Sequence, residues 1–190
     1  KIDHTIDLVI LDVMMPEMSG YAVCAELRKR YTVPVMFLTA KSQDSDKTLG
    51  FSVGGDDYLV KPFSYNELMS RVKAILRRYY VYGAKTAEQS TVIYCCGNVE
   101  IDTSRCQVKV DGEEVILTDI EYRILLLLAS HQQRIYSAQN IYELIWNEPY
   151  TYSSNNNVTV HIRNIRRKLG DDPQNSHTIR TVWGKGYRIE

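Results

Sequence analysis

Side chains suited to phosphoryl chemistry stand at the ends of three successive apolar segments. Asp12 ends the segment DLVILD, Thr39 ends VPVMFLT, and Lys61 follows DYLV. A carboxylate can accept a phosphoryl group as an acyl phosphate, a hydroxyl can donate to a phosphoryl oxygen, and an ammonium can neutralise its charge. Each residue alone has an ordinary explanation, as a turn cap, a packed hydroxyl or a solvated lysine. Their occurrence at three consecutive segment ends predicts a phosphoryl site.

The three apolar segments are predicted to be buried strands of one parallel sheet. Helical patterns lie between and after them, at residues 19–30, 45–54 and 64–78. Strands that alternate with helices indicate a doubly wound α/β fold, in which ligands bind outside the carboxyl ends of the strands. The carboxylate, the hydroxyl and the ammonium should therefore converge at that edge.

The pattern changes after residue 78. Residues 79–91 have neither a helical nor a strand period, and we predict a linker there. Residues 92–117 contain short β-like runs with a turn at VDGEE, which indicates an antiparallel sheet. We therefore expect two domains, residues 1–78 and residues 92–190.

The second domain has the pattern of a winged helix. Three helical segments begin at Thr118, at Ser137 and near Asn155. The chain then continues into TIRTVWGKGYRI, two β-rich runs around a Gly-Lys-Gly turn, which predicts a hairpin. Three helices followed by a hairpin predict an α+β winged helix-turn-helix domain.

The composition is that of an ordinary globular protein, with 44% hydrophobic and 24% charged residues and no net charge. No apolar stretch approaches the roughly 18 residues of a membrane helix. No signal-peptide pattern follows Lys1, so we expect a cytoplasmic protein without a membrane partner. The four cysteines lack metal-ligand spacing and are predicted to be reduced thiols. Of the adjacent Cys95 and Cys96, one should face the core and the other outward.

Basic residues gather in the last part of the chain. Residues 155–190 carry seven basic and three acidic side chains, whereas residues 81–154 carry five basic and ten acidic ones. This uneven distribution indicates a local anion-binding surface.

The helix predicted at residues 155–169 has two faces of opposite character. At 100° per residue, the core face is formed by Val158, Ile162, Ile165 and Leu169. The opposite face is formed by Asn156, Val160, Arg163, Asn164 and Arg167, with Thr159 and Arg166 on one flank and His161 and Lys168 on the other. Arginine and asparagine pair bidentately with guanine and adenine edges, so this face predicts recognition of double-stranded DNA. A solvated basic face is the alternative, and His161 is expected to contact a phosphate or to pack.

These stretches together resemble a known family. DLVILDVMMPEMSGYAVCAELRK, VPVMFLTA and GGDDYLVKPF resemble the second half of a CheY-like receiver domain, and the C-terminal part resembles the winged-helix effector of OmpR/PhoB response regulators. The resemblance covers essentially the whole chain. It implies a bacterial transcription regulator with a sensor histidine kinase, repeated DNA half-sites, a second copy of itself and RNA polymerase as partners. The stretch TVWGKGYRIE is also similar to VanR-type regulators of glycopeptide resistance.

The resemblance implies a role for each residue at the sheet edge. Asp12 would take a phosphoryl group from the kinase's phosphohistidine, with Mg²⁺ bridging, and Met14 would offer its backbone carbonyl to the metal. Thr39 and Tyr58 match the family's switch pair, and Lys61 matches the phosphate-binding lysine.

The resemblance also implies two interaction surfaces. The receiver face made by residues 44–53, 56–60 and 65–77 would pair two copies, with charged candidates at Lys47, Asp56, Asp57, Glu67, Arg71 and Lys73. The DNA-binding residues would be Asn156, Thr159, Arg163, Asn164, Arg166, Arg167 and Lys185.

The wing of the winged helix departs from the family pattern. Many members carry an arginine between the valine and the glycine of TV-x-G, and that arginine enters the minor groove, whereas Trp183 stands here. Lys185, two residues on, is expected to supply the cation instead. We predict that Trp183 packs on the last helix, and contact with sugar and phosphate is the alternative.

A second departure concerns the metal. The family's Mg²⁺ site also uses an acidic pair at the end of the first strand, and neither Asp3 nor Asp7 can supply it, because both lie on or just before the strand that ends at Asp12. We expect the chain to be a fragment that lacks the first two strands and first helix of the receiver, and to bind Mg²⁺ poorly. The alternative is a degenerate receiver in a DNA-binding regulator that works without phosphate.

An enzyme of the haloacid-dehalogenase type is a further alternative, since such phosphatases also use an aspartate at a strand end. They need a second aspartate two residues later, where Met14 stands. We therefore do not expect an enzyme.

Overall fold

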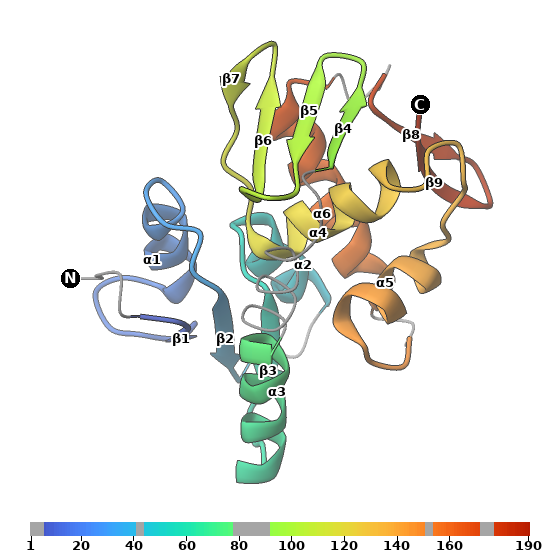
Figure 1. Cartoon of the computed structure of the whole chain (residues 1–190). Coiled ribbons are helices and arrows are strands. Elements are labelled where there is room, and N and C mark those ends of the chain that lie inside the picture. The colour runs from blue at the N-terminus through green and yellow to red at the C-terminus, as the bar shows by residue number, and fades with distance from the viewer. Residues whose placement is uncertain (1–5, 41–43, 78–91, 151–153, 172–176) are drawn as a thin grey trace. The chain divides into compact units, whose positions relative to one another are not determined.

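The structure is a computed structural model, and it describes residues 6–40, 44–77, 92–150, 154–171 and 177–190. The chain forms two compact units that divide between Lys85 and Thr86 (Figure 1). This division falls inside the range predicted for the linker, whose residues themselves lie outside the described ones. Within the described residues, no helix is both long enough and apolar enough to cross a membrane.

A three-stranded parallel sheet forms the base of the N-terminal unit. Its strands are β1 (Val9–Asp12), β2 (Val35–Thr39) and β3 (Asp57–Val60), in the order β1-β2-β3. Val35, Met36 and Phe37 of the central strand have no exposed surface, as expected for a parallel strand covered on both faces. The register pairs Asp12 with Leu38, so the carboxyl ends of the strands lie level. The predicted parallel sheet is confirmed.

Three helices connect and follow these strands: α1 (Gly20–Leu27), α2 (Asp44–Ser52) and α3 (Tyr65–Arg77). Helix α1 begins where the sequence predicts, because the Ser19 side chain accepts a hydrogen bond from Ala22 N at 3.3 Å. The Ser64 side chain caps α3 in the same way, accepting from Glu67 N at 3.0 Å. Both caps satisfy backbone donors that a helix start leaves free.

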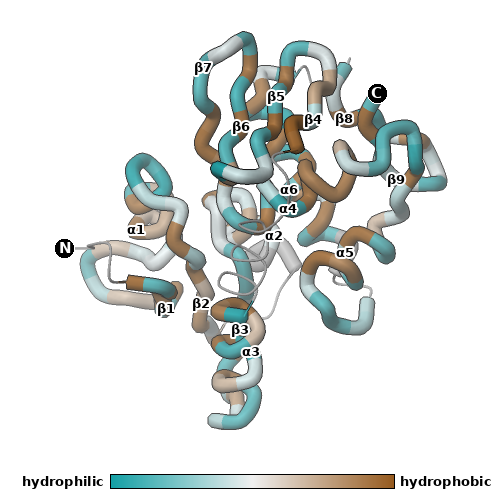
Figure 2. Tube along the Cα trace, viewed as in Figure 1, coloured by the Kyte–Doolittle hydropathy of each residue, from teal (hydrophilic) through white to brown (hydrophobic). Residues whose placement is uncertain are grey.

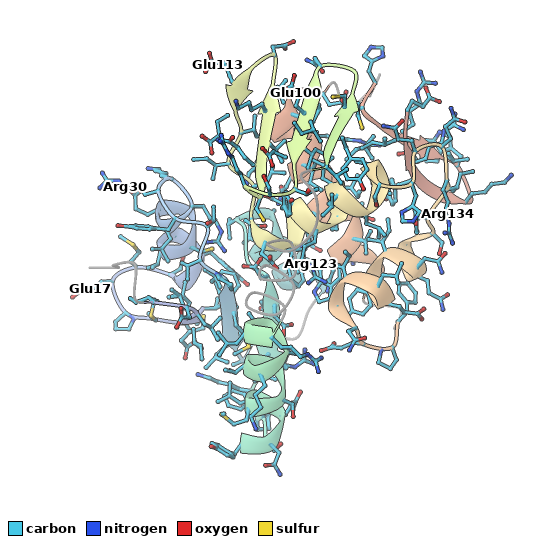
Figure 3. All side chains as sticks on the ribbon, in the orientation of Figure 1. Glu17, Arg30, Glu100, Glu113, Arg123 and Arg134 are labelled. Carbon is cyan, nitrogen blue, oxygen red and sulfur yellow. The ribbon has the colours of Figure 1, made fainter. Side chains whose placement is uncertain are left out.

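The C-terminal unit starts with an antiparallel sheet. Its strands are β4 (Ile93–Cys96), β5 (Val99–Asp102), β6 (Gln107–Val110) and β7 (Glu113–Glu114), in sequence order. Cys96 is buried and Cys95 is exposed, which confirms their predicted opposite faces. Glu100 and Glu113 are also exposed (Figure 3).

Three helices and a hairpin complete this unit: α4 (Asp119–Ala129), α5 (Ala138–Trp146), α6 (Ser154–Leu169), β8 (Ile179–Val182) and β9 (Gly186–Ile189). The predicted capping box is present, since Thr118 and Glu121 bond reciprocally at the start of α4. Helix α4 carries the longest apolar run of the unit (Figure 2) and packs against both α5 and α6. These elements confirm the predicted winged helix-turn-helix arrangement.

Candidate phosphoacceptor site and nucleic-acid interface

The three predicted strand ends meet at one edge of the sheet. The Lys61 ammonium forms an ion pair with Asp12 Oδ2, although 49 residues separate them in the chain. The backbone of Lys61 also bonds to β2, its N–H donating to the Thr39 carbonyl at 2.6 Å. Met14 N donates to the other carboxylate oxygen, Asp12 Oδ1, at 2.9 Å. The carboxylate is therefore oriented by one side chain and one backbone donor.

These two donors keep the Asp12 carboxylate ionised. The hydrogen bond from Lys61 and then that from Met14 N hold the pKa of Asp12 below its usual value, and partial burial opposes them only weakly. The side chain remains 32% exposed, so a reactant can reach it from solvent. An ionised, oriented and accessible carboxylate is the form that can attack a phosphorus atom.

A glycine lets helix α1 begin directly against this site. A Cβ added at Gly20 would lie 2.3 Å from the Asp12 carbonyl oxygen, closer than atoms can pack. Gly20 N also donates to the Val13 carbonyl at 3.1 Å, which fastens the helix start to the loop after β1. The loop that follows the acceptor is thus held from both ends.

The predicted switch pair is buried. Thr39 has no exposed surface, and Tyr58 is 7% exposed. The Tyr58 ring packs beside Phe37, and its hydroxyl lies 3.1 Å from the Tyr21 hydroxyl. The sequence reasoning missed Tyr21 because its place on the apolar face of a helix predicts packing, and nothing local indicates a hydroxyl partner 37 residues away.

The described residues by themselves do not complete a site for Mg²⁺. Mg²⁺ takes oxygen ligands in near-octahedral geometry, and Asp12 with the Met14 carbonyl would supply only part of such a set. Among the residues that the structure describes, no group of three His, Cys, Asp or Glu could hold a metal ion. The carboxylate is also paired with Lys61.

Two of the predicted dimer-surface residues are buried inside the unit, so their assignment to an exposed surface is wrong. Asp56 is 3% exposed and pairs with Arg28 at 2.9 Å. Asp57 is 7% exposed and pairs with Arg71 at 3.2 Å. Both acids stand at or just before β3, where cationic side chains from α1 and α3 reach them.

The other dimer candidates have different surroundings. Arg71 also approaches Glu67 within 3.7 Å, so it already has two acidic neighbours in its own unit. Glu67 and Lys73 are exposed, as predicted. The side chain of Lys47 lies outside the described residues.

Helix α6 has the predicted core face. Val158, Ile162, Ile165 and Leu169 are each 6% exposed or less. Among the side chains of α6 that the structure describes, the exposed ones are Asn156, Thr159, Arg163 and Arg167. These four residues, which we call the α6 polar face, offer hydroxyl, amide and guanidinium donors to a partner.

The exposed face of α6 is narrower than the sequence predicts. Asn164 is 2% exposed and Val160 is 7% exposed, so the placement of both on the exposed face is wrong. His161 has no exposed surface and lies beside the Trp146 ring, with a centroid distance of 5.5 Å. The packing alternative for His161 is therefore confirmed. Asn164 is no longer a candidate for base contact, because a buried amide cannot reach a groove.

Arg166 fastens α6 to the hairpin instead of facing solvent. Its Nε and Nη2 donate to the Ile179 carbonyl at 3.1 and 2.6 Å, and Nη2 also donates to Thr181 Oγ1 at 2.9 Å. A side chain with these partners positions the wing, and contact of Arg166 with DNA stays a prediction. A second link joins the same elements, since the Thr159 and Tyr187 hydroxyls lie 3.4 Å apart.

The hairpin tip contradicts one prediction. Trp183 is 90% exposed, so it does not pack on the last helix. The reason lies in the backbone, because Lys185 N bonds to the Val182 carbonyl at 2.9 Å and closes a tight turn. That turn carries the indole out beyond the strands. Lys185 itself is exposed, as its predicted role requires.

Comparison with known proteins assigns each unit to a protein family. The family described as response regulator receiver domain matches residues 2–73, and the one described as transcriptional regulatory protein, C terminal, matches residues 112–189. The chain is 48% identical over 188 residues to the uncharacterized transcriptional regulatory protein YrkP of Bacillus subtilis, covering 99% of this chain and 81% of YrkP.

Two further similarities agree with this. Regulatory protein VanR of Enterococcus faecium is 39% identical over 186 residues, covering 97% of this chain and 80% of VanR. The solved structure of a cysteine-to-serine mutant of RitR has a TM-score of 0.70 and 26% identity, covering 97% of this chain and 79% of that one. The chain therefore belongs to the OmpR/PhoB family of two-component response regulators, which are transcription regulators and not enzymes, with a receiver domain followed by a winged-helix DNA-binding domain.

Proposed function

We propose that this protein is a transcription regulator that a sensor histidine kinase activates by phosphorylating Asp12. The observation that carries the proposal is the carboxylate at the ligand edge of a parallel sheet, held by Lys61 and Met14 N and open to solvent. The attacking Asp12 oxygen would form a bond to phosphorus as the bond from phosphorus to the kinase histidine breaks. Lys61 would then neutralise charge on the phosphoryl oxygens.

Mg²⁺ would neutralise further charge on the transferred group when it is bound. Receiver domains generally bind this ion at the phosphorylation site. Asp12 and the Met14 carbonyl would hold it together with the acidic pair that the family carries at the end of its first strand. Thr39, buried at the end of the adjacent strand, would donate its hydroxyl to the phosphoryl group. We propose that Tyr58 follows this movement, as the switch partner of Thr39.

We further propose that the activated receiver forms a homodimer, so that two winged helices occupy repeated half-sites on double-stranded DNA. Glu67 and Lys73 are exposed on α3 and remain candidates for the dimer surface, with Arg71 beside them. Single exposed pairs contribute only about 0 to 1 kcal/mol, so they would set register more than strength. RNA polymerase would be the downstream partner, and the place of action the cytoplasm, where bacterial DNA lies.

The α6 polar face is proposed to read the major groove. Arg163→Ala should lower affinity for a preferred duplex by about 1 to 3 kcal/mol and relax the base preference at one position, because a bidentate contact to guanine is lost. Fluorescence anisotropy with a duplex that the chain itself selects from a randomised pool would measure both effects.

Lys109→Ala is the matched control for Arg163→Ala. Lys109 lies on β6 of the same unit, partly exposed, and its loss removes one cation without touching the α6 polar face. It should leave base preference unchanged. Unaltered affinity and preference in the Arg163 variant would rule out this face as the reading surface.

A regulator that works without phosphate is the second candidate. It predicts that the chain binds its DNA site equally well before and after treatment with a phosphoryl donor and Mg²⁺, whereas the first proposal predicts tighter binding once the site is complete.

A further inference from the structure

Two buried tyrosines from distant parts of the chain meet in the core of the N-terminal unit. Tyr21 lies in the first turn of α1 and Tyr58 lies in β3, and their exposed fractions are 9% and 7%. Their hydroxyl oxygens are 3.1 Å apart, which is hydrogen-bond distance, and either group can donate. The contact joins the helix that begins beside Asp12 to one member of the predicted switch pair.

Both rings pack on the same phenylalanine. The Tyr21 ring meets Phe37 edge-on at a centroid distance of 5.1 Å, and the Tyr58 ring lies 6.2 Å from Phe37. Phe37 has no exposed surface and is paired with Tyr58 across β2 and β3. A Cβ added at Gly50 of α2 would lie 3.3 Å from each of the three rings. The rings are therefore tightly packed, and this packing fixes the positions of the two hydroxyl oxygens.

Tyr21 is also connected to the candidate phosphoacceptor. The preceding residue, Gly20, donates from its backbone N–H to the loop after β1 at 3.1 Å, and its lack of a Cβ allows the close approach to the Asp12 carbonyl. A movement of that loop should therefore move the start of α1 and Tyr21 with it. This path from Asp12 to Tyr58 does not pass through Thr39.

We propose that Tyr21 is a positioning residue for the switch, because its hydroxyl holds the Tyr58 ring in a buried position. This inference rests on the proposed function, in which Tyr58 follows Thr39, with the buried position as the activated one. Neither hydroxyl is an atom of the Asp12 site, so the bond between them can form before and after phosphoryl transfer. Tyr21 therefore raises the share of receivers that adopt the activated arrangement without phosphate, and phosphorylation raises it further.

Tyr21→Phe tests this role with little change to the packing. It keeps a ring on Phe37 and removes only the hydroxyl. The loss of one hydrogen bond between protein groups should shift the ratio of buried to outward Tyr58 rings about fivefold toward the outward position. Tyr58→Phe removes the same bond from its other end, so the double variant should behave like either single variant.

Nitration by tetranitromethane measures directly whether the Tyr58 ring is accessible. Peptide mapping by mass spectrometry should show that Tyr58 reacts slowly in the unaltered chain and about fivefold faster in Tyr21→Phe. Cys24 has no exposed surface and lies on the same helix as Tyr21, so its alkylation by iodoacetamide in a separate sample reports any loosening of the whole unit. That alkylation rate should stay unchanged.

Tyr31→Phe is the matched control for Tyr21→Phe. Tyr31 is a partly buried tyrosine that lies beyond the other end of α1, so its replacement removes a hydroxyl from the same unit at a distance from Tyr58 along the helix. It should leave both the nitration of Tyr58 and the alkylation of Cys24 unchanged.

DNA affinity distinguishes a role in the switch from a role in stability alone. The measurement uses this chain preceded by the N-terminal region of a homologous receiver, and the duplex that the unaltered chain selects. Tyr21→Phe should lower the affinity before treatment with acetyl phosphate and Mg²⁺ by up to about fivefold. It should lower the affinity after treatment by less, because phosphorylation already favours the buried ring. The stimulation by the phosphoryl donor should therefore rise.

Each outcome bears on the inference. Nitration of Tyr58 that stays slow in Tyr21→Phe overturns it, and so does a rise that the alkylation of Cys24 matches. Equal losses of DNA affinity before and after the phosphoryl donor overturn the role in the switch. If the donor leaves the DNA affinity of the unaltered protein unchanged, the proposed function fails, whereas the nitration rates still decide whether Tyr21 holds the Tyr58 ring.

Discussion

Asp12→Asn is expected to abolish the incorporation of phosphate from acetyl phosphate. The experiment uses this chain preceded by the N-terminal region of a homologous receiver, which carries the family's acidic pair. Asparagine can still accept the hydrogen bond from Met14 N, which preserves the loop after β1. Its neutral amide is not a nucleophile for phosphorus, so the chemistry is lost while the geometry is kept. Mass spectrometry of the intact chain would measure the added phosphoryl group.

Asp7→Asn provides the control for Asp12→Asn. Asp7 is an exposed acid just before β1, and its replacement should leave labelling unchanged. Label that persists in the Asp12 variant would show that another residue is the acceptor. The chain without the added N-terminal region should take up little or no label, and efficient labelling of that chain would show that the acidic pair is dispensable.

The convergence of Asp12, Thr39 and Lys61 was predictable because strand order and side-chain identity together determine it. Parallel strands bring their carboxyl ends to one edge, and the sequence names the residue at each end. The pairing of Asp12 with Lys61 needed no long-range information beyond that rule. Tyr21 was not predictable, because its partner Tyr58 is specified only by how α1 packs on the sheet.

The burial of Asp56 and Asp57 could not be predicted from the sequence immediately around them. Acids beside a strand end predict an exposed surface when they are considered alone. Their partners are Arg28, the residue that caps α1, and Arg71 of α3, which lie 28 and 14 residues away in the sequence. A charge is buried only where such a partner compensates it, and the sequence does not say which arginine that is.

The errors on α6 have a related cause. A helical wheel assumes one buried side and one exposed side. Helix α6 packs against both α4 and α5 and is also bonded to the hairpin through Arg166, so the buried arc extends to Asn164 and Val160. The error at Trp183 is the opposite one, because apolar character predicts burial, whereas the tight turn carries the indole outward.

Gly186→Ala is expected to be the most damaging substitution in the hairpin. A Cβ at Gly186 would lie 2.0 Å from the Tyr136 carbonyl oxygen and 2.8 Å from Ser137 Cα. Both obstacles are backbone atoms, and Tyr136 is fixed by a two-way pairing with Tyr187, each N–H donating to the other's carbonyl at 2.9 Å. Neither side can yield without breaking this bridge.

The backbone conformation of Gly186 should destabilise the alanine variant further. Its φ is 137°, a conformation that residues with a side chain rarely adopt. Steric conflict and backbone strain together should lower the free energy of unfolding of the DNA-binding unit by about 3 kcal/mol or more. Urea denaturation followed by the fluorescence of the buried Trp146 would measure this change.

Comparison with Gly184→Ala separates the effect of backbone strain from the effect of steric conflict. Gly184 lies two residues away in the same turn with φ 71°, and an added Cβ there would meet nothing within 4 Å. This substitution should lower the free energy of unfolding by only about 1 kcal/mol, because alanine is less stable than glycine in a left-handed backbone conformation. The DNA-binding affinity of the Gly186 variant should also fall, since the wing must leave its bridge to Tyr136. Equal losses of stability in the two variants would show that the bridge between Tyr136 and Tyr187 does not constrain the hairpin.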